Sequence, residues 1–382
     1  MPRTVRQAVP LDVLILGDHA SAHLTAAALR HDHPRLSVAR LALESEHSPD
    51  RLTMVNPRLF DLHRVLGSLR KAKAFAPTFG LSFLSDEPGV AGEFRSKQIS
   101  SLVVSTRWFQ QAVSRLAAES GVDQRHVKQL VIRGAGEDGV HLLADGQSIL
   151  ARVLICAMPL SDADRRTLNF PEAPEDPVSR NYQFARVPAP QTRGFSTRMT
   201  IPMCLDLGGT GAWAWALTCG KILELGVLQP PGRATPAPSD VIAAWCQNLK
   251  SHGILSEDAP LPTRSQYTTI TLPTAQALIG ETVASRTLLI GSAGGFISDC
   301  AEEIYPTCWS GVLAAATAAR ALRERHVQDA LAGYRAAWGS TLGDYLRGPQ
   351  QNLRLLLPLV YRNPMMAARV AEAILFGESV VR

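Results

Sequence analysis

The order of apolar and polar positions predicts a βαβ unit at the start of the chain. A short apolar run covers residues 11–16 and ends at a glycine, an Ala-rich segment follows over 20–30, and a second apolar run covers 36–43. Short runs that are apolar throughout indicate strands buried on both faces, and the Ala-rich segment indicates a helix. Dinucleotide-binding folds begin with such a unit.

A second strand, turn and helix are predicted near residue 290. The apolar residues 288–290 pass into the small residues 291–295, and an Ala-rich segment continues to about residue 323. Glycine lets a ligand approach the backbone closely, and the start of a helix favours anionic groups. We therefore expect a nucleotide to bind at this turn.

The remaining pattern indicates two interleaved lobes. Residues 103–116 predict an amphipathic helix, 127–156 a three-stranded antiparallel insert, 197–227 further strands, and 239–252 a helix that starts at Ser239. The stretch 171–190 is rich in proline and charge and reads as a crossing between lobes. The predicted class is α/β, with a Rossmann-like lobe (1–48, 100–165 and 275–328), a mixed-sheet substrate lobe (49–99 and 166–274) and a helical C-terminal region (329–382).

Composition narrows the class of protein. Of the 382 residues, 46% are hydrophobic and 19% charged, which is typical of an ordered globular chain. The net charge of +5 is spread without a basic block, so we expect no nucleic-acid partner. The six cysteines form no CxxC pair, which favours a reducing cytoplasm. The first apolar run is too short for a signal peptide or a membrane span.

The turn at residues 17–22 is an altered form of the GxGxxG or GxGxxA fingerprint. Gly17 and Ala22 match, but His19 stands at the middle glycine, and Asp18 places a negative charge where phosphates would lie. His19 and His23 lie four apart without a third ligand in sight, so we expect no metal site. The ordinary alternative is a βαβ turn without a ligand.

Several landmarks together resemble a known family. They are the Gly17 turn, Arg107 opening a helix, the closing strand 151–159 and the Gly291 turn. This order resembles the FAD-dependent monooxygenases with the para-hydroxybenzoate hydroxylase fold, in the branch of geranylgeranyl reductases and flavin-dependent halogenases. Residues 289–297 are similar to the LIGDAAGFV segment of that family, and the resemblance spans residues 11–380.

The resemblance implies an FAD-dependent oxidoreductase, most specifically a monooxygenase. Its organic substrate (a small molecule, a lipid or a protein-bound group) would lie between the lobes, and NAD(P)H or a flavin reductase would supply electrons. The acidic ribose partner would be Glu44 or Glu46. The implied cofactor residues are Gly17, His19, Ala22, Glu44, Arg107, Gly291, Ser292, Gly294 and Gly295.

The family's cofactor motifs are altered in this chain. Ser292 replaces the aspartate that holds the ribityl chain, Asp299 replaces a proline, and Glu302-Glu303 replaces a GxG. FAD is therefore expected to bind weakly or to have been lost. The alternative is a flavin-free descendant that serves as an accessory or binding protein or as a non-redox enzyme.

Asp299, Glu302 and Glu303 are the candidate acid/base residues, because they lie beside the predicted cofactor turn. A helix cap at Asp299 with Glu302 as its capping-box partner would explain the same residues.

Halogenation is disfavoured, because residues 78–80 lack the lysine of the halogenase branch. Residues 213–217 resemble the WxWxI pattern of halogenases, and the preferred interpretation is a pair of aromatic residues on one strand face. The helical tail is expected to pack on the core, with a membrane or substrate contact as the alternative.

Overall fold

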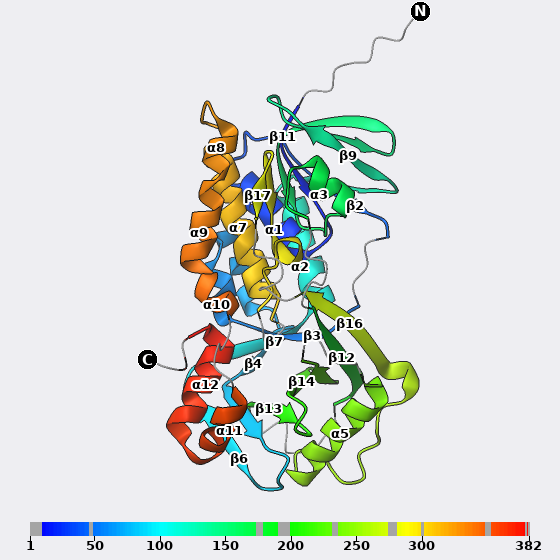
Figure 1. Ribbon diagram of the computed structural model, residues 1–382, viewed down its shortest axis with the longest axis vertical. Helices are drawn as coiled ribbons and strands as arrows, with labels where there is room; N and C mark the ends of the chain where they lie inside the picture. The colour runs from blue at the N-terminus through cyan, green and yellow to red at the C-terminus, as the bar shows by residue number, and fades with distance from the viewer. Residues whose placement is uncertain are drawn as a thin grey trace, which may run out of the picture.

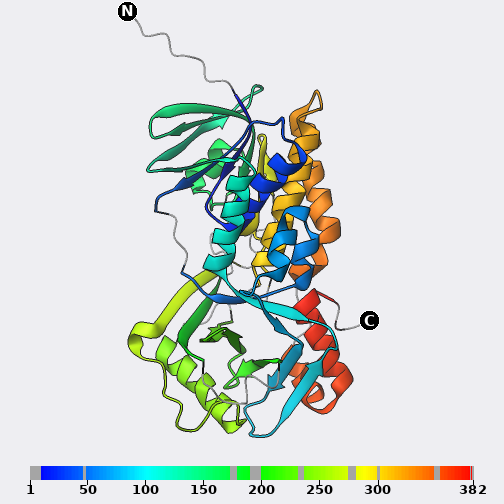
Figure 2. The same ribbon diagram turned by 180° about the vertical axis from the view of Figure 1, so that it is seen from behind.

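The computed structural model shows two lobes stacked end to end (Figure 1). It describes residues 10–45, 49–172, 179–189, 199–230, 236–273, 281–298, 302–347, 353–378 and 380. One lobe contains the whole predicted βαβ unit and also the turn at Gly291. The other is built on a large mixed sheet, and the C-terminal helices run along the side of both lobes (Figures 1 and 2).

The first lobe is built on an eight-stranded sheet with a parallel centre. Its central path runs β17-β18-β11-β1-β2-β8, and β10 and β9 extend β11 as an antiparallel insert. The strands are β1 (Leu11–Leu16), β2 (Val38–Leu43), β8 (Asp123–Val127), β9 (Leu130–Ala135), β10 (Val140–Ala144), β11 (Gln147–Cys156), β17 (Val283–Ala284) and β18 (Thr287–Leu289). This confirms the predicted βαβ unit and the antiparallel insert.

Both faces of the parallel centre are covered, which explains why β1 is apolar throughout. Val13 and Ile15 face a core shared with the helices, whereas Leu14 and Leu16 face the side of the antiparallel insert. Helices that belong to this lobe are α1 (Ala20–Asp32), α2 (Thr106–Glu119), α3 (Asp162–Thr167) and α7 (Ile304–Ala321). Alternate residues of one strand thus serve two cores.

α1 and α7 approach each other closely. A Cβ at Gly311 of α7 would collide with the Thr25 side chain of α1 and would lie 3.0 Å from the Ser21 carbonyl oxygen. Glycine at this position therefore allows the two helices to pack side by side. The N-terminal ends of both helices come together as a result.

The second lobe is built on a seven-stranded sheet in the order β16-β12-β15-β14-β13-β5-β6. Its strands are β5 (Gly80–Leu84), β6 (Ala91–Arg95), β12 (Ser179–Pro188), β13 (Ile201–Leu207), β14 (Ala212–Cys219), β15 (Ile222–Leu228) and β16 (Tyr267–Pro273). A small sheet joins β3 (Leu52–Val55), β7 (Ser101–Ser105) and β4 (Ala76–Thr78). Two short helices that follow β3, η1 (Pro57–Asp61) and η2 (Arg64–Lys71), pack on helices of the first lobe, and η3 (Arg264–Gln266) precedes β16.

Three local predictions about this part of the chain were wrong. The proline-rich stretch predicted as a crossing contains β12, whose Tyr182 and Phe184 are buried on one face of the sheet. The helix predicted from residue 103 begins at Thr106, because the preceding apolar residues pair as β7. α5 (Pro238–Ser251) begins at Pro238 rather than after Ser239, since proline suits the first helical position.

The C-terminal region is helical, as predicted. It comprises α8 (Val327–Leu331), α9 (Gly333–Thr341), α10 (Gly343–Arg347), α11 (Leu353–Arg362) and α12 (Pro364–Phe376), whereas η4 (Gly291–Gly294) lies upstream in the first lobe, after β18. Tyr334 and Trp338 of α9 pack into the core of the first lobe, whereas α11 and α12 cover the inner face of the seven-stranded sheet. No helix in the described ranges is long and apolar enough to span a bilayer.

Candidate functional site

The first glycine turn joins β1 to α1. Gly17 has a φ of +119°, and a Cβ there would lie 3.1 Å from the Met158 backbone nitrogen. His19 is the N-cap of α1 in an extended conformation, and Ala22 is buried inside the helix. Glycine at position 17 is therefore required by the backbone of this turn, and a role of the turn in binding a dinucleotide stays a prediction.

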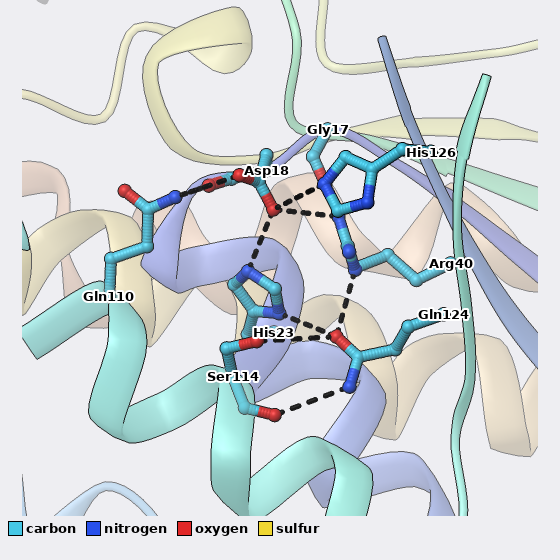
Figure 3. Close-up of polar contacts among 8 residues, drawn as sticks. All are labelled: Gly17, Asp18, His23, Arg40, Gln110, Ser114, Gln124 and His126. Carbon is cyan, nitrogen blue, oxygen red and sulfur yellow. Dashed lines mark hydrogen bonds and ion pairs between the residues drawn. The ribbon is translucent and has the colours of Figure 1, made fainter. Parts of the chain in front are cut away.

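A polar network lies directly beside this turn (Figure 3). One carboxylate oxygen of Asp18, Oδ1, accepts hydrogen bonds from Arg40 Nη1 at 2.9 Å and lies 3.1 Å from His23 Nε2. Gln110 of α2 donates to the backbone oxygen of Asp18 and, at 3.1 Å, to its Oδ2. Three secondary-structure elements thus converge on one carboxylate.

Arg40 is the centre of the network. It lies on β2, its exposed fraction is 1%, and its Nη1 also donates to the Gly17 carbonyl oxygen at 2.9 Å. Its Nε donates to Gln124 Oε1 of β8 at 3.1 Å. The arginine therefore ties the first glycine turn to the neighbouring strands.

The network changes the electrostatic picture expected from the sequence. Burial alone would raise the pKa of Asp18, but the hydrogen bond from His23 and the charges of His23 and Arg40 hold the pKa below its ordinary value. His126 adds a longer contact at 3.8 Å. The Asp18 charge is therefore compensated inside the protein and does not face the helix terminus alone.

Two residues predicted for this end of the cofactor lie apart from the network. Glu44 is exposed in the turn after β2, and Glu46 lies outside the described residues. Arg107 is exposed at the start of α2, where its backbone N–H donates to Asp50 Oδ1 at 3.1 Å. Arg40 and Gln110, which the sequence reading missed, reach the turn instead. An arginine inside an otherwise apolar strand was the one signal available for Arg40.

The second glycine turn, η4, faces the start of α1. Gly291 has a φ of +58°, and its N–H donates to Ser310 Oγ of α7 at 2.9 Å. A Cβ at Gly291 would lie 2.6 Å from Ser21 Oγ. The Ser21 hydroxyl is buried and, within the described part of the chain, has no hydrogen-bond partner. Ser292, at the position of the family's aspartate, is half-buried beside it.

The last residues of this turn complete a tight bend. Gly294 is buried, and Gly295 closes η4 with a φ of +77°. The four predicted residues of the second turn therefore lie together, within reach of the first turn through the α1–α7 contact. Their role in holding a cofactor stays a prediction.

The two glutamates lie just before α7. Glu302 is 5% exposed; its Oε1 accepts from the Tyr305 N–H at 2.8 Å, and its Oε2 accepts from the Tyr345 hydroxyl of α10 at 2.8 Å. Burial raises its pKa to about 8, and the charge of Glu303 adds to the rise. Burial therefore favours the protonated form of this carboxyl near neutral pH.

Of the capping alternative, the described residues show only the part that concerns Glu302. α7 begins at Ile304 with Glu303 as its N-cap, so Glu302 precedes the helix and accepts from an amide of its first turn. Asp299, predicted as the cap or as an acid/base residue, lies outside the described residues.

Glu303 connects the two lobes. It forms an ion pair of 3.0 Å with Arg51, which is 2% exposed and lies over the Tyr182 ring of β12 at 5.5 Å. The Tyr182 hydroxyl donates to Glu224 Oε1 at 2.9 Å, and Glu224 accepts from Leu52 N–H at 2.6 Å. Charged and aromatic groups therefore line the junction directly beside Glu302.

The tryptophan pattern of β14 belongs to the core of the second lobe. Trp215 stacks on Tyr182 with ring centroids 5.2 Å apart, and Arg180 lies over Trp213 at 5.5 Å. Both tryptophans share one strand face in one core. This agrees with the preferred interpretation of a pair of aromatic residues.

One group of metal-ligand type lies elsewhere on the surface. Donor atoms of His31, Asp32 and His63 come within 4.8 Å of one another. Arg64 donates to two of them, to His31 Nδ1 and to Asp32 Oδ1, each at 2.9 Å. The guanidinium of Arg64 thus occupies one donor atom of His31 and one of Asp32. The expectation of no metal site stays a prediction.

Comparison with known proteins establishes the fold. No protein-family model and no curated protein matches the chain. Among solved structures, a flavoprotein/dehydrogenase from Cytophaga hutchinsonii has a TM-score of 0.68 at 16% identity, covering 96% of this chain and 93% of its own. A geranylgeranyl bacteriochlorophyll reductase-like protein from Thermoplasma acidophilum has a TM-score of 0.69 at 14% identity, covering 96% and 95%.

A third similar structure is PqsL from P. aeruginosa in complex with 2-aminobenzoylacetate. It has a TM-score of 0.66 at 15% identity and covers 97% of this chain and 99% of its own. Flavin-dependent halogenases are also among the similar structures. The chain therefore has the fold of FAD-dependent aromatic hydroxylase-like flavoproteins, which confirms the resemblance at the level of the fold.

Proposed function

We propose that this chain is a flavin-dependent oxidoreductase, specifically a monooxygenase, that acts on an organic substrate at the junction of the two lobes. The observation that carries the proposal is the convergence of the two glycine turns at the starts of α1 and α7, in a flavoprotein fold that covers nearly the whole chain. FAD is the cofactor that this fold implies.

The residues of the second turn fit a flavin. Ser21 offers a buried hydroxyl without a protein partner among the described residues, and Gly291 and Gly295 keep the backbone free of side chains beside it. The start of α1 favours an anion at the same place. Ser292 can hydrogen-bond a sugar hydroxyl, although more weakly than a carboxylate does. These residues would hold the ribityl chain and a phosphate.

A bound flavin would supply the redox and oxygen chemistry, and the protein would supply orientation and a dry environment. Glu302 would hold a proton on its carboxyl at neutral pH, next to the junction. Arg51 would fix Glu303 and the aromatic wall of Tyr182. The buried polar groups at the junction would thereby position substrate and exclude water.

The substrate class and the electron source belong to the same proposal. PqsL is described in complex with a small aromatic keto acid, which supports a small organic molecule; lipid and protein-bound substrates remain in the proposal. Electrons would come from NAD(P)H or from a flavin reductase. Halogenation stays disfavoured because residues 78–80 carry no lysine, although halogenases share the fold.

The Asp18–Arg40 network favours a second candidate. If a side-chain network has replaced the whole cofactor, the chain is a flavin-free descendant, namely a binding protein or a non-redox enzyme that uses Glu302 or Glu303. The two candidates differ in whether any flavin binds.

The deciding experiment is a flavin titration of the purified protein, followed by absorbance and flavin fluorescence. Saturable binding supports the first candidate, and a flavin-stimulated oxidation of NAD(P)H that depends on an organic substrate would support the monooxygenase. Absence of binding at high flavin concentration would refute it in favour of the second candidate. Ser292→Asp should tighten binding; a weaker complex would show that η4 does not hold the ribityl chain.

A further inference from the structure

The end of the site that would receive the adenosine of FAD is closed by protein side chains. In dinucleotide folds the diphosphate lies at the start of the first helix, and an acidic side chain of the second strand accepts hydrogen bonds from the ribose. Here the β2 side chain that reaches the first turn is Arg40, and the acid, Asp18, lies on the turn itself. Compared with a dinucleotide site, the strand β2 therefore carries a positive charge in place of the negative one, and the turn carries the negative charge.

We infer that this chain holds a flavin without its adenosine half, that is, a flavin of the FMN type, because the Asp18–Arg40 pair occupies the place of the ribose. The inference rests on the proposed flavin-dependent function and specifies its cofactor. Flavin ring, ribityl chain and one phosphate would be bound, and the Asp18–Arg40 network would keep the adenosine out.

Arg40 is unable to replace an acidic ribose partner. A guanidinium has five donors and no acceptor, so it accepts no hydrogen bond from a hydroxyl. Its Nη1 and Nε already donate to Gly17, Asp18 and Gln124, and only 1% of the residue is exposed. Admitting a ribose would require Arg40 to give up its partner Asp18, which leaves a buried guanidinium without compensation.

Other elements close the same place from the side of α2. The side-chain amide of Gln110 donates to the backbone oxygen and to the carboxylate of Asp18. Gln124 of β8 donates to the Ser114 carbonyl oxygen at 3.2 Å. Figure 3 shows these side chains directed at one another across the turn. The network is thus satisfied by protein groups alone, without a ligand.

The opposite end of the site differs in that a buried polar group there has no protein partner among the described residues. The Ser21 hydroxyl is 1% exposed, faces the Gly291 turn and has no partner among the residues that the structure describes. One phosphate at the start of α1 would satisfy this hydroxyl as well as helix amides. A single phosphate is the number that FMN carries.

The first experiment compares FMN, FAD, riboflavin and ADP by calorimetry and flavin fluorescence with the full chain. We expect FMN and FAD to bind within about threefold of each other, FMN to bind more tightly than riboflavin, and ADP at millimolar concentration not to displace flavin. If FAD binds more than about tenfold tighter than FMN, or if ADP displaces the flavin, the inference is overturned while the proposed flavin-dependent function stands. Failure of every flavin to bind would refute the proposed function together with it.

The second experiment reverses the exchange of charges. The double variant Asp18→Gly/Arg40→Glu places an acid on β2 and frees the turn, so FAD should gain at least about tenfold over FMN, the effect of one charged hydrogen bond. Arg125→Glu is the matched control, because this exposed β8 arginine pairs with Asp123 outside the network. The control should leave the FAD-to-FMN ratio unchanged.

A milder variant guards against loss of folding in the double variant. Gln110→Ala removes only the hydrogen bonds from α2 and keeps the Asp18–Arg40 ion pair. It should raise the FAD-to-FMN ratio by about threefold, since a neutral hydrogen bond is worth less than a charged one. An unchanged ratio in every folded variant would overturn the inference.

Discussion

The buried carboxyl of Glu302 should make the stability of the protein fall as pH rises. Its pKa lies at about 8 in the folded chain, compared with an ordinary value of 4.5. Between these two values the folded chain holds a proton that the unfolded chain has released. The free energy of unfolding therefore decreases by about 1.4 kcal/mol per pH unit from this group.

The expected loss between pH 5 and pH 8 is about 3–4 kcal/mol, because the group is almost fully buried and little solvent screens it. Above pH 8 both states are ionised and the loss stops growing. Glu302→Gln mimics the neutral carboxyl: its oxygen can accept from the Tyr305 N–H, and its amide can donate to the Tyr345 oxygen. The variant should lack this slope.

Urea unfolding of both proteins at half-unit steps from pH 5 to pH 9 measures the difference directly. The variant should approach wild-type stability near pH 5 and exceed it progressively towards pH 8. Glu303→Gln is the comparison: it keeps the buried acid and removes a charge that contributes to its raised pKa, so its slope should become smaller and still be present. Parallel curves for wild type and Glu302→Gln would show that the carboxyl is ionised in the folded protein and would refute the reasoning.

Three further outcomes are expected. Tyr345→Phe removes a hydrogen bond to the Glu302 carboxylate, so the pKa of Glu302 should rise further, as followed by NMR of carboxyl-labelled glutamate; an unchanged titration would contradict the contact. Gly311→Ala should cost about 1–3 kcal/mol in thermal or urea unfolding through the clash with α1, whereas Gly339→Ala, with no atom within 4 Å of the new Cβ, should be neutral or stabilising. Arg40→Met should cost about 3–5 kcal/mol, and adding Asp18→Asn should recover much of it; full additivity of the two losses would show that the pair is not coupled.

Local patterns predicted the elements that depend on neighbouring residues. The runs 11–16 and 36–43 form β1 and β2 because they are buried on both faces, which leaves no ambiguity in the pattern. β12 was missed because nearby prolines and charges outweighed the alternation of Tyr182 and Phe184. Its assignment depends on pairing with β15 and β16, which lie far away in the sequence.

The two glycine turns of the candidate site were predictable from the sequence, whereas the side-chain contacts around them were not. Glycines at 17 and 291 mark positions of special backbone geometry, and such positions are visible in a single sequence. The contact of Asp18 with Arg40 and Gln110 depends on the register of β2 against β1 and on the docking of α2. The burial that raises the pKa of Glu302 likewise comes from α10, which follows it by some forty residues.

The interleaving of the lobes has a consequence for synthesis. The parallel sheet of the first lobe contains strands from residues 11–16, 123–127 and 287–289. One face of the second sheet is covered only when α11 and α12 pack on it. Neither core is complete until almost the whole chain has left the ribosome. Contacts between residues so distant in sequence close slowly, so we expect the nascent chain to expose apolar strands for much of its translation and to depend on chaperone holding until its last helices emerge.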